Sequence, residues 1–228
     1  MATIYDVAAY AGVSPKTVSR VINGDAPVSD KTRAKVETAI AALGYIPSSA
    51  ARVMRSNRSD LVGLITGAIS RTGEYGGVHG LPDMFLIKGI QQKIREAGKT
   101  LMIADTDNRY EQIDPLVRTF MEHRAEGILY VTESHREIVL PEMPNRCPMV
   151  LVNCFDAVGT PSVLPDDERG QYDLVRKIIR RGHRRIAYIT LQAGAEATRL
   201  RLAGYRRALD ESDMVFDPDL VQTGITDF

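Results

Sequence analysis

The first 45 residues carry short apolar repeats between capping and turn residues, a pattern that predicts several small helices. Val7 and Ala11 recur at helical spacing. Thr3 can cap the helix that holds them, with Asp6 in its first turn. Gly12 is then expected to end this helix, because glycine readily takes the left-handed conformation that follows many helices.

A second helix is predicted directly after this turn. Ser14 is suited to cap it, and Pro15 stands at the first helical position, where a missing N–H costs nothing. Val18, Val21 and Ile22 recur on one side and are expected to face a core. Two short helices joined by a tight turn with glycine are typical of the helix-turn-helix unit.

The opposite side of this second helix carries Lys16, Thr17 and Arg20. Long cationic side chains and a hydroxyl suit phosphates and base edges, and Lys or Arg here most often binds guanine through O6 and N7. The alternative is an ordinary solvated helix face. Caps, turn and the following basic segment all stand in register, which favours contact with DNA.

A third helix and a basic segment follow. The cap, inner stripe and stop of this helix are Ser29, Val36, Ala39, Ile40, Leu43 and Gly44. Residues 48–56 are good helix formers, but an isolated helix shorter than about 12 residues is marginal in water. Arg52, Arg55 and Arg58 therefore indicate a segment that becomes ordered only on a phosphate surface.

The rest of the chain alternates apolar strands with amphipathic helices. Strands are predicted at 61–66, 100–104, 127–131, 149–153 and 186–190, and helices at 84–97, 110–123, 171–181 and 197–209. This alternation favours parallel α/β sheets. The loops 67–82, 105–109, 153–156 and 190–198 should then lie at the carboxyl ends of strands, where open α/β sheets bind ligands.

Charge is distributed unevenly along a chain of 228 residues whose formal net charge is +0. Residues 1–58 hold eight Lys and Arg against four Asp and Glu, which leaves 21 against 25 in the remainder. A basic N-terminal part on an acidic body fits DNA binding through one end. The arginines around His183 at 180–185 could form a second nucleic-acid patch, although a solvated turn is the preferred interpretation.

Composition argues against several other classes of protein. No apolar run approaches the roughly 20 residues of a membrane span, and the start lacks the features of a signal peptide, so a cytoplasmic protein is expected. Cys147 and Cys154 are read as reduced structural thiols. Because the histidines are scattered and no nucleophile stands beside a base, we predict no metal, no cofactor and no enzymatic activity.

Several of these runs together resemble the lactose-repressor (LacI-type) family. The N-terminal runs are Ile4–Ala8, Ala11–Ser14, Thr17–Asn23 and Leu43–Ser48, and the body contributes 181–187 and 199–205. The resemblance implies a helix-turn-helix DNA-binding headpiece (1–46), a hinge helix and linker (47–58), and an effector domain like periplasmic binding proteins (59–228, the body). It implies two parallel-sheet lobes, the second incomplete because the family pattern continues beyond Phe228.

The resemblance also implies which residues contact DNA. In the headpiece these are Tyr5, Ser14, Pro15, Lys16, Thr17, Ser19, Arg20, Asn23, Ser29, Thr32 and Tyr45. In the hinge they are Ser48, Ala51, Arg52, Met54 and Arg55. Family hinge helices enter the minor groove and wedge a leucine between base pairs. Met54 stands at that position here, and methionine is a softer wedge.

For the effector, the resemblance points to Arg201, whose guanidinium suits sugar hydroxyls or a carboxylate. Asn153 matches a polar cleft position, and Asp166 and Arg199 are weaker candidates, together with Asp167. A structural ion pair is the alternative role for Arg201. The loop at 70–82 differs from the family pattern, so no effector contacts are carried over to it.

The expected function is therefore that of a sequence-specific regulator, most simply a repressor. A homodimer would bind near-palindromic double-stranded operator DNA, because a two-fold protein matches a two-fold site. Its affinity would be controlled by a small-molecule effector, for which a sugar is expected. The alternatives are a constitutive DNA-binding protein that has lost its ligand site, a small-molecule-binding protein without regulatory function, and an α/β enzyme with a DNA-binding arm.

Overall fold

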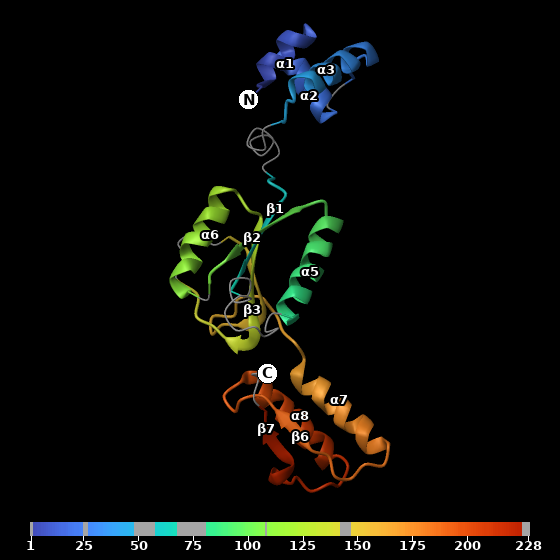
Figure 1. The fold of residues 1–228 in the computed structure, drawn as a ribbon, viewed down its shortest axis with the longest axis vertical. Helices are drawn as coiled ribbons and strands as arrows, with labels where there is room; N and C mark the ends of the chain where they lie inside the picture. Colours follow the sequence, from blue (N-terminus) through green and yellow to red (C-terminus); the bar gives the residue numbers. More distant parts are fainter. Residues whose placement is uncertain are drawn as a thin grey trace. The chain divides into compact units, whose positions relative to one another are not determined.

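The structure, a computed structural model, describes residues 2–24, 27–47, 58–67, 81–107, 109–141 and 147–224, the side chains of 81–84 excepted. It divides into two compact units, Met1–Ser59 and Asp60–Phe228, each of which is considered by itself (Figure 1). No helix in the described ranges is long and apolar enough to cross a membrane.

Three helices form the N-terminal unit: α1 (Ile4–Ala11), α2 (Pro15–Asn23) and α3 (Asp30–Leu43). The predicted caps are present, since the side chains of Thr3, Ser14 and Ser29 each accept a backbone N–H of the first turn. The Thr3 backbone N–H also donates to the Asp6 carboxylate at 2.7 Å, which lowers the pKa of Asp6. Glycines in the left-handed conformation end all three helices, the first at Gly12 as expected.

A small core holds these helices together. Each helix contributes one fully buried valine, namely Val7, Val18 and Val36. Alanines from α1 and α3 pack between them, and Ile22 and Leu43 close the edges. The apolar faces predicted from helical spacing are therefore confirmed.

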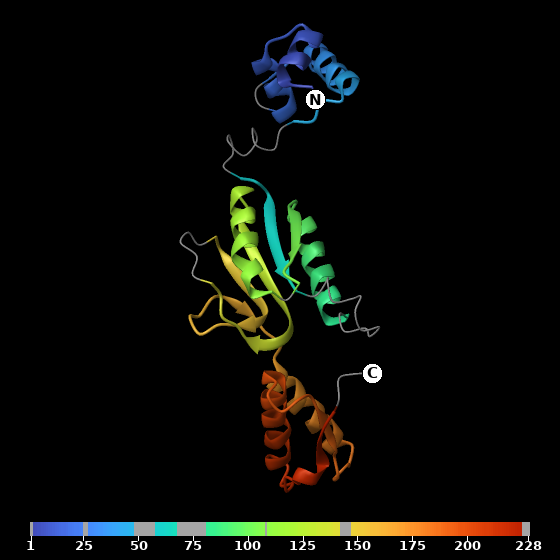
Figure 2. The same ribbon diagram turned by 60° about the vertical axis from the view of Figure 1, so that its left-hand side comes forward.

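The second unit is built on a five-stranded parallel sheet. Its strands are β1 (Leu61–Thr66), β2 (Thr100–Asp105), β3 (Gly127–Glu137), β4 (Met149–Phe155) and β5 (Ser162–Val163), in the order β2-β1-β3-β4-β5. The helix α5 (Leu81–Glu96) covers one face of the sheet. The helix α6 (Ile113–Glu122), which follows a 3-10 turn at Tyr110–Gln112, covers the other face (Figures 1 and 2).

Successive apolar side chains of β1 point to opposite faces of the sheet. Ile65 packs with Phe120 of α6, whereas the next residue back, Leu64, packs with Ile87 of α5. Gly63 lies directly under the Phe120 ring, where an added Cβ would lie 2.7 Å from a ring carbon. Both cysteines are free thiols, and burial raises the pKa of each.

The remaining elements of this unit include a second pair of parallel strands. β6 (Tyr188–Thr190) pairs with β7 (Val221–Thr223), which follows a 3-10 turn at Pro218–Leu220. The helices α7 (Asp167–Arg180) and α8 (Glu196–Asp210) pack side by side (Figure 2). Tyr205 and Leu209 of α8 and Val175 of α7 form the buried core.

Several boundaries differ from the sequence-based expectation. β3 continues to Glu137 instead of ending at 131, and its register with β4 shifts between Val131 and Arg136. The added residues are polar, so the apolar pattern gave no strand signal there. α7 begins at Asp167, not at 171, because Asp166 caps it. The strand predicted at 186–190 starts at Tyr188, and the short strands β5 and β7 were not predicted.

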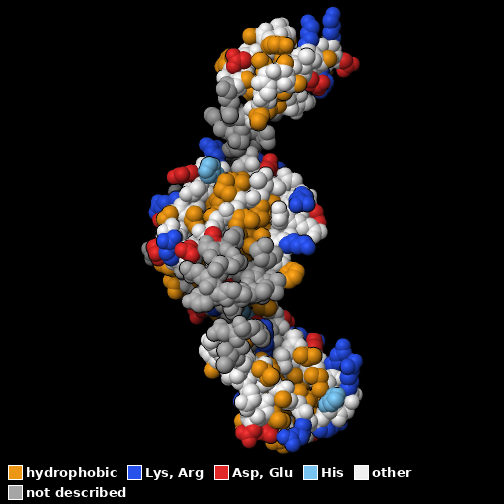
Figure 3. All heavy atoms as spheres, viewed as in Figure 1, with side chains coloured by type: hydrophobic (Ala, Val, Ile, Leu, Met, Phe, Trp, Pro, Cys, Tyr) orange, Lys and Arg blue, Asp and Glu red, His pale blue; other side chains and the backbone are white. Residues whose placement is uncertain are grey.

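The arginine-rich turn between α7 and β6 is exposed. The Arg184 guanidinium donates to the carbonyl oxygen of Ile179 at 3.1 Å and thereby caps the end of α7. Lys and Arg side chains gather along this side of the unit (Figure 3). This arrangement agrees with the interpretation of residues 180–185 as a solvated turn.

Candidate DNA interface and ligand site

The polar side of α2 presents two long cations to solvent. Lys16 and Arg20 are exposed, and neither forms an ion pair or a side-chain hydrogen bond with another described residue. Val18 and Val21, on the opposite side, are buried in the core. Core packing thus fixes the helix rotation, so that both cations project away from the N-terminal unit.

Several other predicted DNA-contacting residues also have structural roles in the headpiece. The Ser14 hydroxyl lies 2.9 Å from the Thr17 hydroxyl, and Ser29 and Thr32 repeat this pair at the start of α3. The Asn23 amide donates to the Ser19 carbonyl oxygen at 2.6 Å. Capping and phosphate contact are compatible, since backbone N–H groups at a helix start also attract anions.

The two aromatic candidates of the headpiece lie in different environments. Tyr5 is 71% exposed at the start of α1, and Tyr45 packs against the headpiece core. Pro15 opens α2 at its first position. The hinge candidates Ser48, Ala51, Arg52, Met54 and Arg55 lie outside the described residues.

Buried threonines lie at the carboxyl ends of β1, β2 and β6 and in the middle of β3. Thr66 ends β1, Thr106 follows β2, and Thr132 lies in β3 where the register with β4 becomes irregular. The Thr106 backbone N–H donates to the Thr66 carbonyl oxygen at 2.8 Å. At the end of β6, the Thr190 hydroxyl donates to the Thr198 hydroxyl at 3.1 Å. These polar groups lie where parallel sheets bind ligands.

Asn153 is held tightly at this edge. Its side-chain amide donates to the Thr132 carbonyl oxygen at 3.0 Å, and the Thr132 hydroxyl donates back to the Asn153 carbonyl oxygen at 3.0 Å. Its φ of 61° lies in the left-handed region, which asparagine tolerates better than most residues. The amide oxygen of Asn153 has no hydrogen-bond partner among the described protein groups.

Arg201 lies on α8 and bonds to a buried carboxylate. Its Nε donates to Oδ1 of Asp167 at 2.6 Å, and Nδ1 of His135 lies 2.9 Å from Oδ2 of the same carboxylate. The side chains of Asp167 and His135 are 4% and 5% exposed, whereas that of Arg201 is 40% exposed. Arg201 also lines a pocket of about 320 Å³ together with Thr190 and Tyr205.

Two of the three weaker effector candidates, Asp166 and Arg199, have evident structural partners. Asp166 caps α7 by accepting the Arg169 backbone N–H at 3.1 Å. Arg199 donates through Nε to Glu196 at 2.9 Å, which lowers the pKa of that carboxyl group. The structure therefore groups Arg201 with Asp167 and His135, and it does not join Asp166 or Arg199 to that group.

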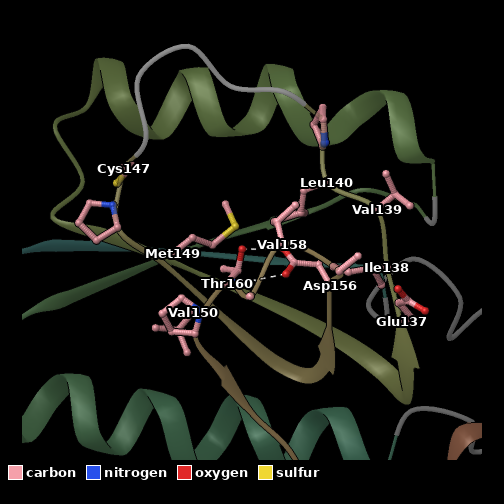
Figure 4. A pocket seen from close by; sticks show the side chains of 15 residues that line it. Glu137, Ile138, Val139, Leu140, Cys147, Met149, Val150, Asp156, Val158 and Thr160 are labelled. Atoms are coloured by element: carbon pink, nitrogen blue, oxygen red, sulfur yellow. Dashed lines mark hydrogen bonds between the residues drawn. The ribbon is translucent and has the colours of Figure 1, made fainter.

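A larger, mostly apolar pocket of about 650 Å³ opens between the end of β3 and the residues on either side of β4 (Figure 4). Met149, Val150 and Leu140 line it, and the Asp156 carboxylate at its rim accepts both the backbone N–H and the hydroxyl of Thr160. None of the predicted effector residues lines this pocket. In the described ranges no cluster of three His, Cys, Asp or Glu side chains could hold a metal ion.

Comparison with known families covers most of the chain. Residues 3–48 match the family model of bacterial regulatory proteins of the lacI family. Residues 84–227 match the model of periplasmic binding proteins and the sugar-binding domain of the LacI family. The chain belongs to the LacI family. Its membership confirms the family resemblance and the predicted fold class, a helical headpiece followed by parallel α/β lobes.

Individual LacI-family relatives align along nearly the whole chain. The ribose operon repressor of Escherichia coli (strain K12) is 34% identical over 100% of this chain and 67% of its own length. The transcriptional repressor PurR of Vibrio atlanticus is 31% identical over 98% of this chain and 65% of its own. The lac repressor dimer bound to operator and the anti-inducer ONPF has a TM-score of 0.69 at 25% identity, covering 97% and 64%. The chain thus spans about two thirds of their length.

Sequence reasoning missed part of the polar group around Arg201. His135 was read as one of several scattered histidines, and the buried threonines were not considered. His135 lies 32 residues from Asp167 in sequence, so no local spacing could reveal their contact. The only available signal was that polar residues directly follow predicted strands.

Proposed function

We propose that this LacI-family protein is a transcriptional repressor that binds a near-palindromic double-stranded operator as a homodimer. The observation that carries the proposal is that Lys16 and Arg20 are exposed on α2 and have no partner among the described residues. The other side of this helix is buried in the headpiece core. Unpaired cations fixed on one face of a helix suit guanine edges and phosphates in the major groove. The repressors named among its relatives support the same assignment.

In this proposal each part of the chain has its own role. Residues 1–46 read the operator, 47–58 form the hinge with Arg52, Met54 and Arg55 near the minor groove, and 59–228 bind the effector. Near-palindromic DNA follows from a two-fold dimer, which places two copies of α2 on equivalent half-sites. The protein acts on DNA in the cytoplasm of its cell, without a membrane, a cofactor or an enzymatic reaction.

The effector in this proposal is a small neutral or weakly charged molecule, with a sugar as the first class to test. Arg201, Asn153 and the buried threonines supply hydrogen-bond donors and acceptors, and the Arg201 charge is offset by Asp167. Hydroxyl-rich ligands match such a set better than a multiply charged anion does. D-ribose is the first ligand to test, because one relative is named the ribose operon repressor.

The test is to select binding sites from genomic fragments with the full chain, followed by footprinting. A protected, near-symmetric site is expected, and the Lys16→Ala/Arg20→Ala double variant should lose it. Lys31→Ala/Lys35→Ala on α3 is the matched control, since it removes the same charge from another exposed helix. A folded protein that protects no symmetric site on any fragment would exclude the repressor assignment.

A further inference from the structure

Asp167 is a buried carboxylate whose two oxygens bond to different partners. Oδ1 accepts from Nε of Arg201 at 2.6 Å, and Oδ2 contacts Nδ1 of His135 at 2.9 Å. Its side chain is only 4% exposed. A buried carboxylate is costly unless it is paired and hydrogen-bonded, and Asp167 has one such partner on each oxygen.

The bond to Arg201 uses Nε and leaves the rest of the guanidinium available. Neither terminal amino group of Arg201 has a described protein partner, and the side chain reaches the small pocket beside Thr190. Because a guanidinium is planar, fixing its Nε–H also sets the direction of the two terminal amino groups. Asp167 therefore determines how Arg201 presents its donors.

His135 in turn determines where Asp167 stands. Its ring is 5% exposed and meets the Phe155 ring edge-on, with centroids 5.8 Å apart and an interplanar angle of 81°. We assign Nδ1 of His135 as the donor in this contact, because the Asp167 carboxylate already accepts from Arg201 through its other oxygen. His135 comes from β3, whereas Asp167 and Arg201 come from α7 and α8. The contact therefore connects the five-stranded sheet to the helices that pack on β6.

We propose that His135 and Asp167 are positioning residues that aim Arg201 at the ligand, and that this aim depends on the contact between β3 and α7. The inference rests on the ligand role of Arg201 in the proposed function. It goes further because it names the two residues that organise Arg201. A change in the packing of β3 against α7 would shift Asp167 relative to His135. This shift would reorient the N–H donors of Arg201.

The first experiment needs no ligand. Exchange of the Arg201 Nε–H with solvent is measured by NMR in the full chain labelled with ¹⁵N-arginine, and this signal is expected to be protected. In His135→Ala the exchange should accelerate about tenfold, the order expected for a loosened charge-assisted hydrogen bond. His183→Ala, in the exposed turn, is the matched control and should leave the exchange unchanged.

Conservative variants separate positioning from general stability. His135→Asn places an amide N–H near the position of Nδ1 and should preserve protection of the Arg201 Nε–H. His135→Gln extends its amide toward the position of Nε2 and should lose that protection, although it is similar in size. The comparison of His135→Asn with His135→Gln still tests the inference if His135→Ala does not fold. Equal exchange in the Asn and Gln variants, or an unchanged rate in a folded Ala variant, would overturn the inference.

The second experiment measures D-ribose binding by calorimetry in the same variants. The dissociation constant is expected to rise at least about tenfold in His135→Ala, the factor for one lost or misaligned hydrogen bond, and to recover in His135→Asn. Ribose affinity equal in all variants, with measurable binding in each, would contradict the role of the pair in aiming Arg201. Absence of ribose binding in the unaltered protein would count against ribose as effector, and the exchange comparison would still decide the positioning role.

Discussion

At the scale of single residues, some polar side chains of the headpiece cap its helices, whereas others are available to contact DNA. The Ser14 and Thr17 hydroxyls bond to each other at 2.9 Å, while Lys16 and Arg20 between and beyond them have no described partner. A long cation without a local partner keeps its full hydrogen-bonding capacity for DNA. Base preference should therefore depend on Lys16 and Arg20 more than on the capping hydroxyls.

Replacing Arg20 by alanine should weaken specific operator binding by about 1–3 kcal/mol, the range for a bidentate contact to guanine, and should relax base preference at one position per half-site. The measurement is a titration of operator and single-base variants with the altered protein. Lys35→Ala is the control and should reduce binding to all sequences alike, because only phosphate attraction is affected. An Arg20→Ala loss that is equal on random DNA would show that Arg20 contacts phosphate alone.

The group formed by Arg201, Asp167 and His135 shows why some contacts could not be predicted from sequence. Arg201 was proposed from a family motif, and its bond to Asp167 spans 34 residues. The alternative considered for Arg201, a structural ion pair, is present, and it leaves the terminal amino groups available. No spacing rule relates His135 to either residue, because tertiary packing of β3 against α7 creates the contact. Such sites require the fold before they can be assembled.

At the scale of elements, the sequence signals were strongest where local chemistry ends a helix or fills a strand. The caps and glycines of α1, α2 and α3 set their bounds almost to the residue, and the apolar run at 61–66 is β1. Signals failed in β3 beyond 131, where the strand is polar, and in β5 and β7, which have two and three residues. In these places pairing with a neighbouring strand, not residue preference, makes the strand.

Two glycines on adjacent helices offer a test of how α7 and α8 pack. An added Cβ at Gly204 would collide with the Glu168 carbonyl oxygen and approach the Tyr172 backbone nitrogen at 3.0 Å, whereas Gly170 has open space. Gly204→Ala should lower the free energy of unfolding by about 1–3 kcal/mol or more through overpacking. Gly170→Ala should raise it by about 0.5–1 kcal/mol, since alanine favours a helix.

Hydrogen exchange of amides in α7 and α8, read by mass spectrometry on both variants, is the measurement. Protection should fall in Gly204→Ala and be kept or increased in Gly170→Ala. Because the headpiece is a separate compact unit, its amides serve as an internal reference in the same sample. Equal protection of α8 in the two variants would mean that the helices can move apart at little cost, contrary to this account of their packing.

At the scale of the whole molecule, the proposed function assigns DNA contact and ligand contact to different compact units. Excess positive charge lies in residues 1–58, and the proposed ligand residues lie between 66 and 201. In the proposed function, residues 47–58 are the hinge that joins the two units along the chain. A substitution there is therefore expected to alter DNA geometry without altering either compact unit.

Replacing Met54 by alanine should reduce operator bending more than it reduces headpiece docking. If Met54 is the minor-groove wedge, its removal lowers the unstacking that produces a kink, while contacts from α2 to the major groove persist. A circular-permutation gel shift measures the bend, and footprinting measures docking. Met54→Leu is the matched control and should keep the bend or sharpen it, because leucine is the stiffer wedge. An unaltered bend angle in Met54→Ala would remove the wedge role.

If the same molecule binds both ligand and operator and the two events are coupled, each must change the affinity for the other by the same factor. A ligand that changes operator affinity by some factor requires the operator to change ligand affinity by the same factor, which is about 5–150-fold in typical allosteric proteins. Fluorescence titration of operator at zero and saturating ligand gives one factor. Calorimetric titration of the same ligand with and without saturating operator gives the other.

A random duplex of equal length, at the same salt concentration, is the control for this comparison. It shares the sequence-independent attraction between phosphates and the basic headpiece but lacks the base contacts of the operator, so it should change ligand affinity by much less than the operator does. The sign of the operator effect then separates induction from co-repression: weaker ligand binding on the operator identifies an inducer. Two unequal factors, with both complexes at equilibrium, would mean that ligand capture and operator binding are not linked through a shared change in conformation.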